Sequence, residues 1–203
     1  MEHLGKLFGT PAKVRLLRLF LFNPERVFDR DMLVHTARVN AETVKKECAA
    51  LERATLIVRK SFLKEVDATS SDSKRRRVIG WTVDHKFPYV AQLTSFLQQT
   101  LIVSHADLRK RFRNVGAVQL LLVAHLFVGD RERALDLLIV GDRLDVAQAR
   151  SVVRTIEAEY GRELRYTILT TDEYDYRRRV RDRLVREMLE VPHEEVINRL
   201  RER

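Results

Sequence analysis

Apolar residues recur three and four positions apart in the first fifty residues, and turn residues separate the apolar segments. The first segment starts at Thr10 and Pro11, because threonine is a good N-cap and proline is favoured in the first helical turn. It ends at Asn23 and Pro24, since the residue before a proline avoids the helical conformation. The pattern therefore predicts a helix over residues 11–22.

Two shorter apolar stripes follow, and a very tight turn separates them. Asp29 and Asn40 can each cap a helix by accepting a hydrogen bond from its first turn. Only Arg38 and Val39 lie between the two predicted helices. Two amphipathic helices joined in this way are typical of a helix-turn-helix, whose second helix can enter the major groove of DNA.

Two segments rich in β-branched and apolar residues come next, at residues 56–66 and 77–83, and they flank a polar tip at residues 67–76. This arrangement predicts a β-hairpin. Its returning side carries a basic run: Lys74, Arg75, Arg76 and Arg77. Such a run can lie along a phosphate backbone or reach a minor groove, and it can also be an ordinary solvated turn.

Residues 31–57, DMLVHTARVNAETVKKECAALERATLI, resemble the helix-turn-helix of winged-helix transcriptional regulators. The resemblance implies that the third helix binds double-stranded DNA through its solvent side. The positions concerned are Thr43, Lys45, Lys46 and Arg53, together with the basic run of the hairpin. Lys45 and Lys46 are also residues that any helix surface carries. Thr55 stands where the family usually has glycine, so a mildly strained left-handed threonine is expected there.

Further helices are predicted on either side of the domain boundary. One runs over residues 87–101, and its apolar stripe either packs on the first helix or forms a homodimer contact. Another runs over residues 104–114 and starts at the N-cap Ser104. The boundary between the two expected domains lies between Leu101 and Ser104, which gives domains of residues 1–101 and 102–203.

The second half alternates strands with helices. Strands are predicted over residues 117–128, 134–140 and 164–169, a helix over residues 145–160, and helices alone after the third strand. The short connection between the first two strands predicts an antiparallel pair. A third strand reached through a helix predicts a mixed sheet with helices on one face. The fold class expected for the chain is therefore α+β.

The segments ALDLLIVGD and GRELRYTILT resemble those of the minimal nucleotidyltransferase-like domain, and winged-helix regulators fused to such a domain form a bacterial and archaeal group. Active members hold two metal ions with three carboxylates. The resemblance places Asp136 at one of these positions, whereas Ala134 and Arg165 stand at the other two, and no Gly-Ser pair precedes the second strand. With these replacements, the resemblance implies a domain that is catalytically inactive. Asp136 and Arg165 either line a vestigial nucleotide pocket or pair with each other across adjacent strands.

Charge separates the two halves of the chain. Of the net charge of +9, residues 1–100 contribute 18 basic and 11 acidic residues, and residues 101–203 contribute 20 and 18. A basic first half suits binding to a phosphate backbone, although basic surfaces also bind membranes and acidic proteins.

Composition excludes several other classes. The single cysteine, Cys48, allows no intrachain disulfide and favours the reducing cytoplasm. The six histidines show no metal-ligand spacing, so neither a metal nor a cofactor is expected. The longest apolar run, residues 117–128, is too short to span a bilayer.

Together these features predict a cytoplasmic, sequence-specific DNA-binding transcriptional regulator. Its nucleotidyltransferase-like domain would sense a ligand such as a nucleotide, bind a protein partner or assemble the protein. Two alternatives remain at this stage: an active nucleotidyltransferase held near DNA, and an antitoxin-like protein that represses its own operon.

Overall fold

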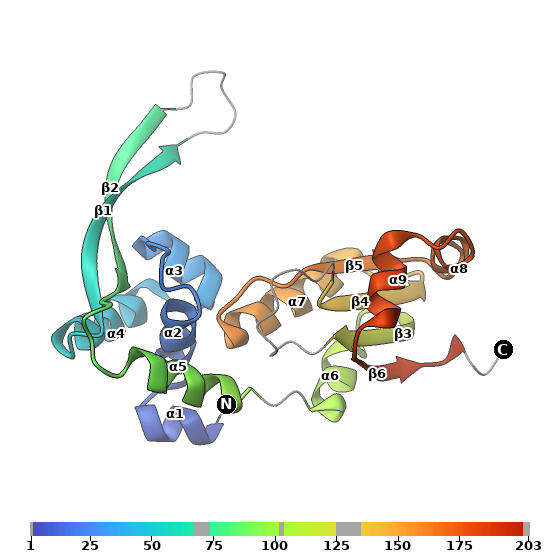
Figure 1. Ribbon diagram of the computed structural model, residues 1–203, viewed down its shortest axis with the longest axis horizontal. Helices are drawn as coiled ribbons and strands as arrows, with labels where there is room; N and C mark the ends of the chain where they lie inside the picture. Colours follow the sequence, from blue (N-terminus) through green and yellow to red (C-terminus); the bar gives the residue numbers. More distant parts are fainter. Residues whose placement is uncertain (1, 67–73, 102–103, 125–134, 201–203) are drawn as a thin grey trace. The chain divides into compact units, whose positions relative to one another are not determined.

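The computed structural model describes residues 2–66, 74–101, 104–124 and 135–200 of the chain (Figure 1). The fold is a mixture of helices and strands with two separate sheets. The chain divides into two compact units. The first comprises residues 1–100 and 155–162, and the second comprises residues 101–154 and 163–203.

Helices form most of the first unit. They are α1 (Glu2–Phe8), α2 (Pro11–Leu21), α3 (Arg30–Ala37), α4 (Ala41–Arg53) and α5 (Val90–Gln99). The three predicted N-caps are confirmed, because Thr10, Asp29 and Asn40 each accept a hydrogen bond from the backbone N–H three residues on, at 3.0, 2.8 and 2.8 Å. Arg38 adopts the left-handed conformation (φ 50°) and so closes the short turn between α3 and α4. The sequence pattern did not predict α1.

A long antiparallel hairpin follows α4, with β1 (Ile57–Val66) paired to β2 (Lys74–Val83) (Figure 1). The predicted start of the returning strand at residue 77 is wrong. Lys74, Arg75 and Arg76 already belong to β2, because the ladder with β1 extends to the pair formed by Val66 and Lys74. Residues 67–73 of the predicted tip lie outside the described part of the chain.

The base of the hairpin is bonded to the segment that joins α2 and α3. Phe28 and Trp81 exchange both backbone hydrogen bonds, with N···O distances of 2.9 and 2.8 Å. Gly80 permits this approach, because a Cβ atom there would lie 2.5 Å from the carbonyl oxygen of Phe28. At the start of the hairpin, Thr55 has a φ of 59°, so the predicted left-handed threonine is confirmed.

One hydrophobic core joins these elements. Phe20 and Phe28 are fully buried and meet edge to face, with ring centroids 5.8 Å apart. Leu97 of α5 is fully buried in the same core, so the stripe of this helix packs within the monomer. The helix predicted from residue 87 begins at Val90, because Phe87 lies in the preceding turn and packs against the core.

The second unit is built on a four-stranded sheet. Its strands are β3 (Ala117–Ala124), β4 (Leu137–Asp142), β5 (Tyr166–Leu169) and β6 (His193–Asn198), in the order β5-β4-β3-β6. As predicted, β3 and β4 are antiparallel, and β5 lies parallel to β4 after α7 (Val146–Tyr160). The expectation of helices alone after residue 169 is wrong. Six residues become β6 because they pair with the distant strand β3, and such pairing outweighs local propensity.

Helices cover both faces of this sheet, so the prediction of helices on one face is wrong. Apolar side chains of β3 and β4, such as Leu122 and Leu138, pack with α8 (Thr171–Arg179) and α9 (Arg183–Glu190) on one face. The alternate residues Leu121 and Ile139 are also fully buried, and α6 (His105–Phe112) packs beside β6. Strands buried on both faces have continuous rather than alternating apolar runs, which the segments LLLVA and LLIV display.

Cys48 should be chemically inert while the first unit is folded. Burial, together with the nearby carboxylates of Glu52 and Glu47, raises the pKa of its thiol to about 12. The thiolate is the nucleophile, so the native protein should not react with a disulfide reagent at pH 8, whereas the denatured protein should react with one equivalent. Native protein that reacts as fast as a free thiol would contradict the packing of α4.

Candidate nucleic-acid interface

The solvent side of α4 carries three of the four predicted DNA-binding residues of this helix. Lys45, Lys46 and Arg53 are exposed, and Thr43 is half-buried in the first turn. The opposite side is buried in the core, with Val44 and Cys48 at 0% exposure and Leu51 at 6%. Helical geometry therefore fixes which side chains point to solvent.

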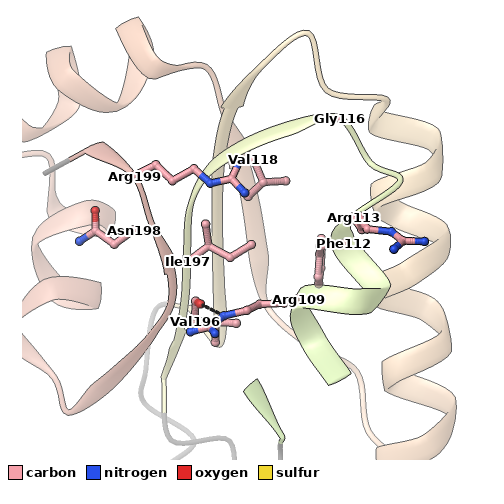
Figure 2. A pocket seen from close by; sticks show the side chains of 9 residues that line it. All are labelled: Arg109, Phe112, Arg113, Gly116, Val118, Val196, Ile197, Asn198 and Arg199. Atoms are coloured by element: carbon pink, nitrogen blue, oxygen red, sulfur yellow. Dashed lines mark hydrogen bonds between the residues drawn. The ribbon is translucent and has the colours of Figure 1, made fainter. Parts of the chain in front are cut away.

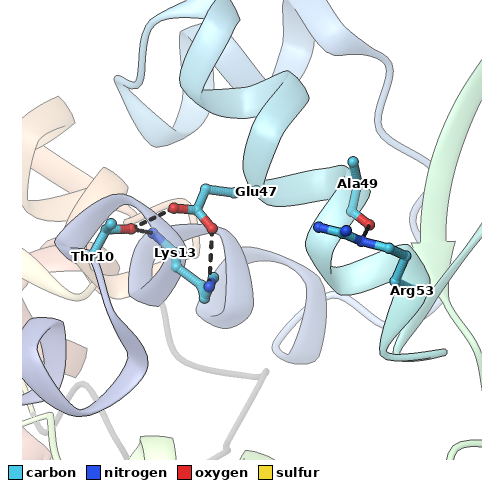
Figure 3. Close-up of polar contacts among 5 residues, drawn as sticks. All are labelled: Thr10, Lys13, Glu47, Ala49 and Arg53. Atoms are coloured by element: carbon cyan, nitrogen blue, oxygen red, sulfur yellow. Dashed lines mark hydrogen bonds and ion pairs between the residues drawn. The ribbon is translucent and has the colours of Figure 1, made fainter.

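A buried carboxylate holds α4 against α2 (Figure 3). Glu47 is 3% exposed and lies directly after Lys46 in the chain. One carboxylate oxygen accepts a hydrogen bond from Thr10 Oγ1 at 2.8 Å, and the other lies 3.2 Å from Lys13 Nζ. Thr10 also caps α2, so a single contact fixes the start of α2 and the rotation of α4. The sequence pattern did not identify this contact, since glutamate and lysine far apart in a sequence carry no pairing signal.

The acidic residues of α4 are largely neutralised within the unit. Glu47 pairs with Lys13, and Glu52 pairs with Arg59 of β1 at 2.8 Å. Only Glu42, in the first turn, adds an exposed carboxylate to the side that carries the lysines. The exposed side of α4 therefore presents a net positive charge, which attracts polyanions.

The basic run of the hairpin is divided between two faces. Arg75, Arg76 and Arg77 are exposed, and successive residues of a strand point to opposite faces. Arg75 and Arg77 therefore share one face, and Arg76 lies on the other, opposite Lys64 of β1. The fourth residue, Lys74, begins β2, and its side chain lies outside the described part of the chain. The four residues cannot follow one phosphate path side by side, as a basic loop could.

Lys64 connects the hairpin to α3. Its Nζ lies 2.6 Å from the carboxylate of Asp29, the residue that caps α3. Burial acts to raise the pKa of Asp29, but the hydrogen bonds from Lys64 and from the N–H of Met32 outweigh burial and hold this pKa below its usual range. Lys64 thus positions the hairpin and is engaged by a partner within the protein. No local sequence signal indicates this bond.

The second predicted site brings Asp136 and Arg165 together just before β4 and β5. The carboxylate of Asp136 accepts a hydrogen bond from the backbone N–H of Arg165 at 2.8 Å and lies 3.6 Å from Arg165 Nε. The backbone N–H of Asp136 also donates to the carbonyl of Arg165, at 2.6 Å. The two residues therefore pair across adjacent strands, which is one of the two uses that the sequence left open. Ala134 lies outside the described residues.

Within the described ranges, no group of three or more His, Cys, Asp and Glu side chains is positioned to hold a metal ion. No helix in these ranges has both the length and the apolar composition needed to cross a bilayer. Comparisons with protein-family models, with curated proteins and with solved structures found no match.

Removing the carboxylate of Glu47 should destabilise the first unit. Glu47→Ala leaves Thr10 and Lys13 without their buried partner, and because the Lys13 side chain is 25% exposed, we expect a loss of about 1–3 kcal/mol in the free energy of unfolding. Trp81, the only tryptophan, reports unfolding of this unit by fluorescence in urea. The control Glu42→Ala changes an exposed carboxylate of the same helix and should cost at most about 0.5 kcal/mol. Equal losses in the two variants would refute the role of Glu47.

Proposed function

We propose that the first unit is a winged helix-turn-helix domain that binds double-stranded DNA. The observation that carries this proposal is the exposed side of α4, where Lys45, Lys46 and Arg53 gather while Glu47 and Glu52 are engaged by other side chains. The order of elements supports it. The helices α2, α3 and α4 follow one another, and the hairpin β1–β2 comes after α4. Between α2 and α3, Phe28 forms a β-bridge to the hairpin. This is the order of elements expected of a winged helix-turn-helix.

In this proposal α4 lies in the major groove. The side chains of Lys45, Lys46 and Arg53 then face base edges or the flanking phosphates. The hairpin contacts the backbone beside the groove through the arginines of β2. Because these arginines alternate between faces, Arg75 and Arg77 can contact one strand of the duplex while Arg76 remains on the other side of the hairpin. The charge that each arginine neutralises makes the binding depend on salt.

The full-length protein should bind duplex DNA with an affinity that falls steeply as salt rises, measured by fluorescence anisotropy. Replacing Arg75, Arg76 and Arg77 with alanine should weaken binding to any sequence at least tenfold. It should also reduce the slope of log affinity against log salt by about 1 for each phosphate that the variant no longer neutralises. Lys46→Ala should instead reduce the preference for the specific site over unrelated DNA.

A matched control exists on α8. Arg177, Arg178 and Arg179 form a second run of three arginines, and their replacement with alanine removes the same charge from the second unit. This control should keep the wild-type affinity and salt slope. Binding that is flat with salt, or that falls equally in both triple variants, would sink the proposal.

We infer that the chain acts as a sequence-specific transcriptional regulator and that its second unit is a non-catalytic nucleotidyltransferase-like domain with a sensing or assembly role. An inactive domain is supported by the contacts of Asp136, whose carboxylate accepts a hydrogen bond from the backbone N–H of Arg165 and lies beside the guanidinium of the same residue. A cation beside this carboxylate opposes the binding of a metal ion at the same place.

The proposal that the second unit is catalytically inactive can be tested directly. With magnesium or manganese present, the protein should transfer no labelled nucleotide to itself, to RNA or to components of a cell extract. Metal-dependent transfer that disappears in Asp136→Ala would establish an active nucleotidyltransferase instead.

A further inference from the structure

A second basic site lies in the second unit, at the end of the sheet away from Asp136 and Arg165. A cavity of about 440 Å³ opens between α6 and β6 (Figure 2). The cavity is lined by Arg109 of α6, by Arg113, which directly follows α6, and by Arg199, which follows β6. Val118 and Ile197 contribute apolar surface. This volume falls within the range of small-molecule sites, about 300–1,000 Å³.

The backbone of β6 positions the first of these arginines. The ladder between β3 and β6 shifts register between Leu121 and Leu122, so Val196 has no partner on β3. The carbonyl of Val196 instead accepts a hydrogen bond from Arg109 Nε at 2.7 Å. This bond leaves the two terminal nitrogens of Arg109 for another acceptor. Bulges of this kind often occur at sheet edges and beside functional sites, where they redirect side chains.

The arginines that line the cavity keep their positive charge within the described part of the chain. Among the described residues, no carboxylate forms an ion pair with Arg109, Arg113 or Arg199, and the lining includes no acidic residue. Figure 2 shows Arg109 reaching toward the cavity from α6 and Arg199 from the end of β6, with Ile197 between them, whereas the side chain of Arg113 points away from both. Arg109 and Arg199 therefore give the cavity a positive potential, which attracts an anion.

We propose that this cavity binds a small phosphate ester. Guanidinium groups bind phosphate oxygens through paired hydrogen bonds, and a phosphate monoester carries about −1.5 to −2 charges at pH 7, which suits the two arginines Arg109 and Arg199 better than a single carboxylate does. The apolar surface of Val118 and Ile197 receives the organic part of the ester. This site is independent of DNA binding by the first unit, so either proposal can fail alone.

The test measures binding of AMP, ATP, pyrophosphate and adenosine to the full chain by calorimetry, without DNA. AMP and ATP should bind, and adenosine, which has no phosphate, should not. Arg199→Ala should weaken binding at least tenfold, because it removes a charged hydrogen-bond donor. The backbone N–H of Arg199, which bonds to Gln119, remains in this variant, so β6 keeps its pairing. Arg199→Lys should restore part of the affinity.

Two controls locate the site. Arg150→Ala removes an exposed arginine of α7 and should leave binding unchanged. Arg165→Ala, at the other end of the sheet, should also leave it unchanged. Loss of binding in Arg165→Ala rather than in Arg199→Ala would overturn the proposal, as would the absence of any phosphate binding at millimolar concentration. Pyrophosphate that binds as tightly as ATP would show that the organic part makes no contact, which contradicts the role of Val118 and Ile197.

Discussion

The carboxylate of Glu47 has to be neutralised before α4 can pack. An unpaired charge inside a protein core costs several kcal/mol, and Thr10 and Lys13 are the partners that satisfy this buried group. Because both partners lie at the start of α2, the bond fixes the separation of α2 and α4 and the rotation of α4 about its axis. That rotation decides which side chains face solvent. The positive side of the helix is therefore set both by the apolar side chains of α4 in the core and by the negative charge buried beside them.

Two other ion pairs hold the hairpin against the helices of the first unit. Lys64 binds Asp29 at the start of α3, and Arg59 binds Glu52 in α4. Each bond uses an acidic residue of the helical part to hold a basic residue of β1. The pairing of β1 with β2 then sets the faces on which Arg75, Arg76 and Arg77 lie. These acidic residues thus position the basic residues of β1. The lysines and arginines on the solvent side of α4 and on β2 remain exposed.

The second unit uses charge differently. At one end of its sheet Asp136 and Arg165 neutralise each other. At the other end, Arg109 is held by a backbone carbonyl and keeps its positive charge without a carboxylate partner among the described residues. In the first case the charge of the arginine is satisfied within the protein. In the second, the same type of side chain is fixed in place and remains able to attract an anion.

The sequence alone determined the features that depend on neighbours in the chain. The caps at Thr10, Asp29 and Asn40 and the apolar stripes of α2 and α4 are set by residues a few positions apart, and each was predicted. The left-handed Thr55 was expected from a family resemblance rather than from its neighbours. Only the tertiary structure decided the rest. The strand β6 and the bonds of Glu47 and Lys64 depend on partners 34 or more residues away in the sequence, and the burial of the sheet depends on the helices that pack on it. One sequence records no distance between such positions, because the free energy that brings them together comes from burial and pairing in the folded chain.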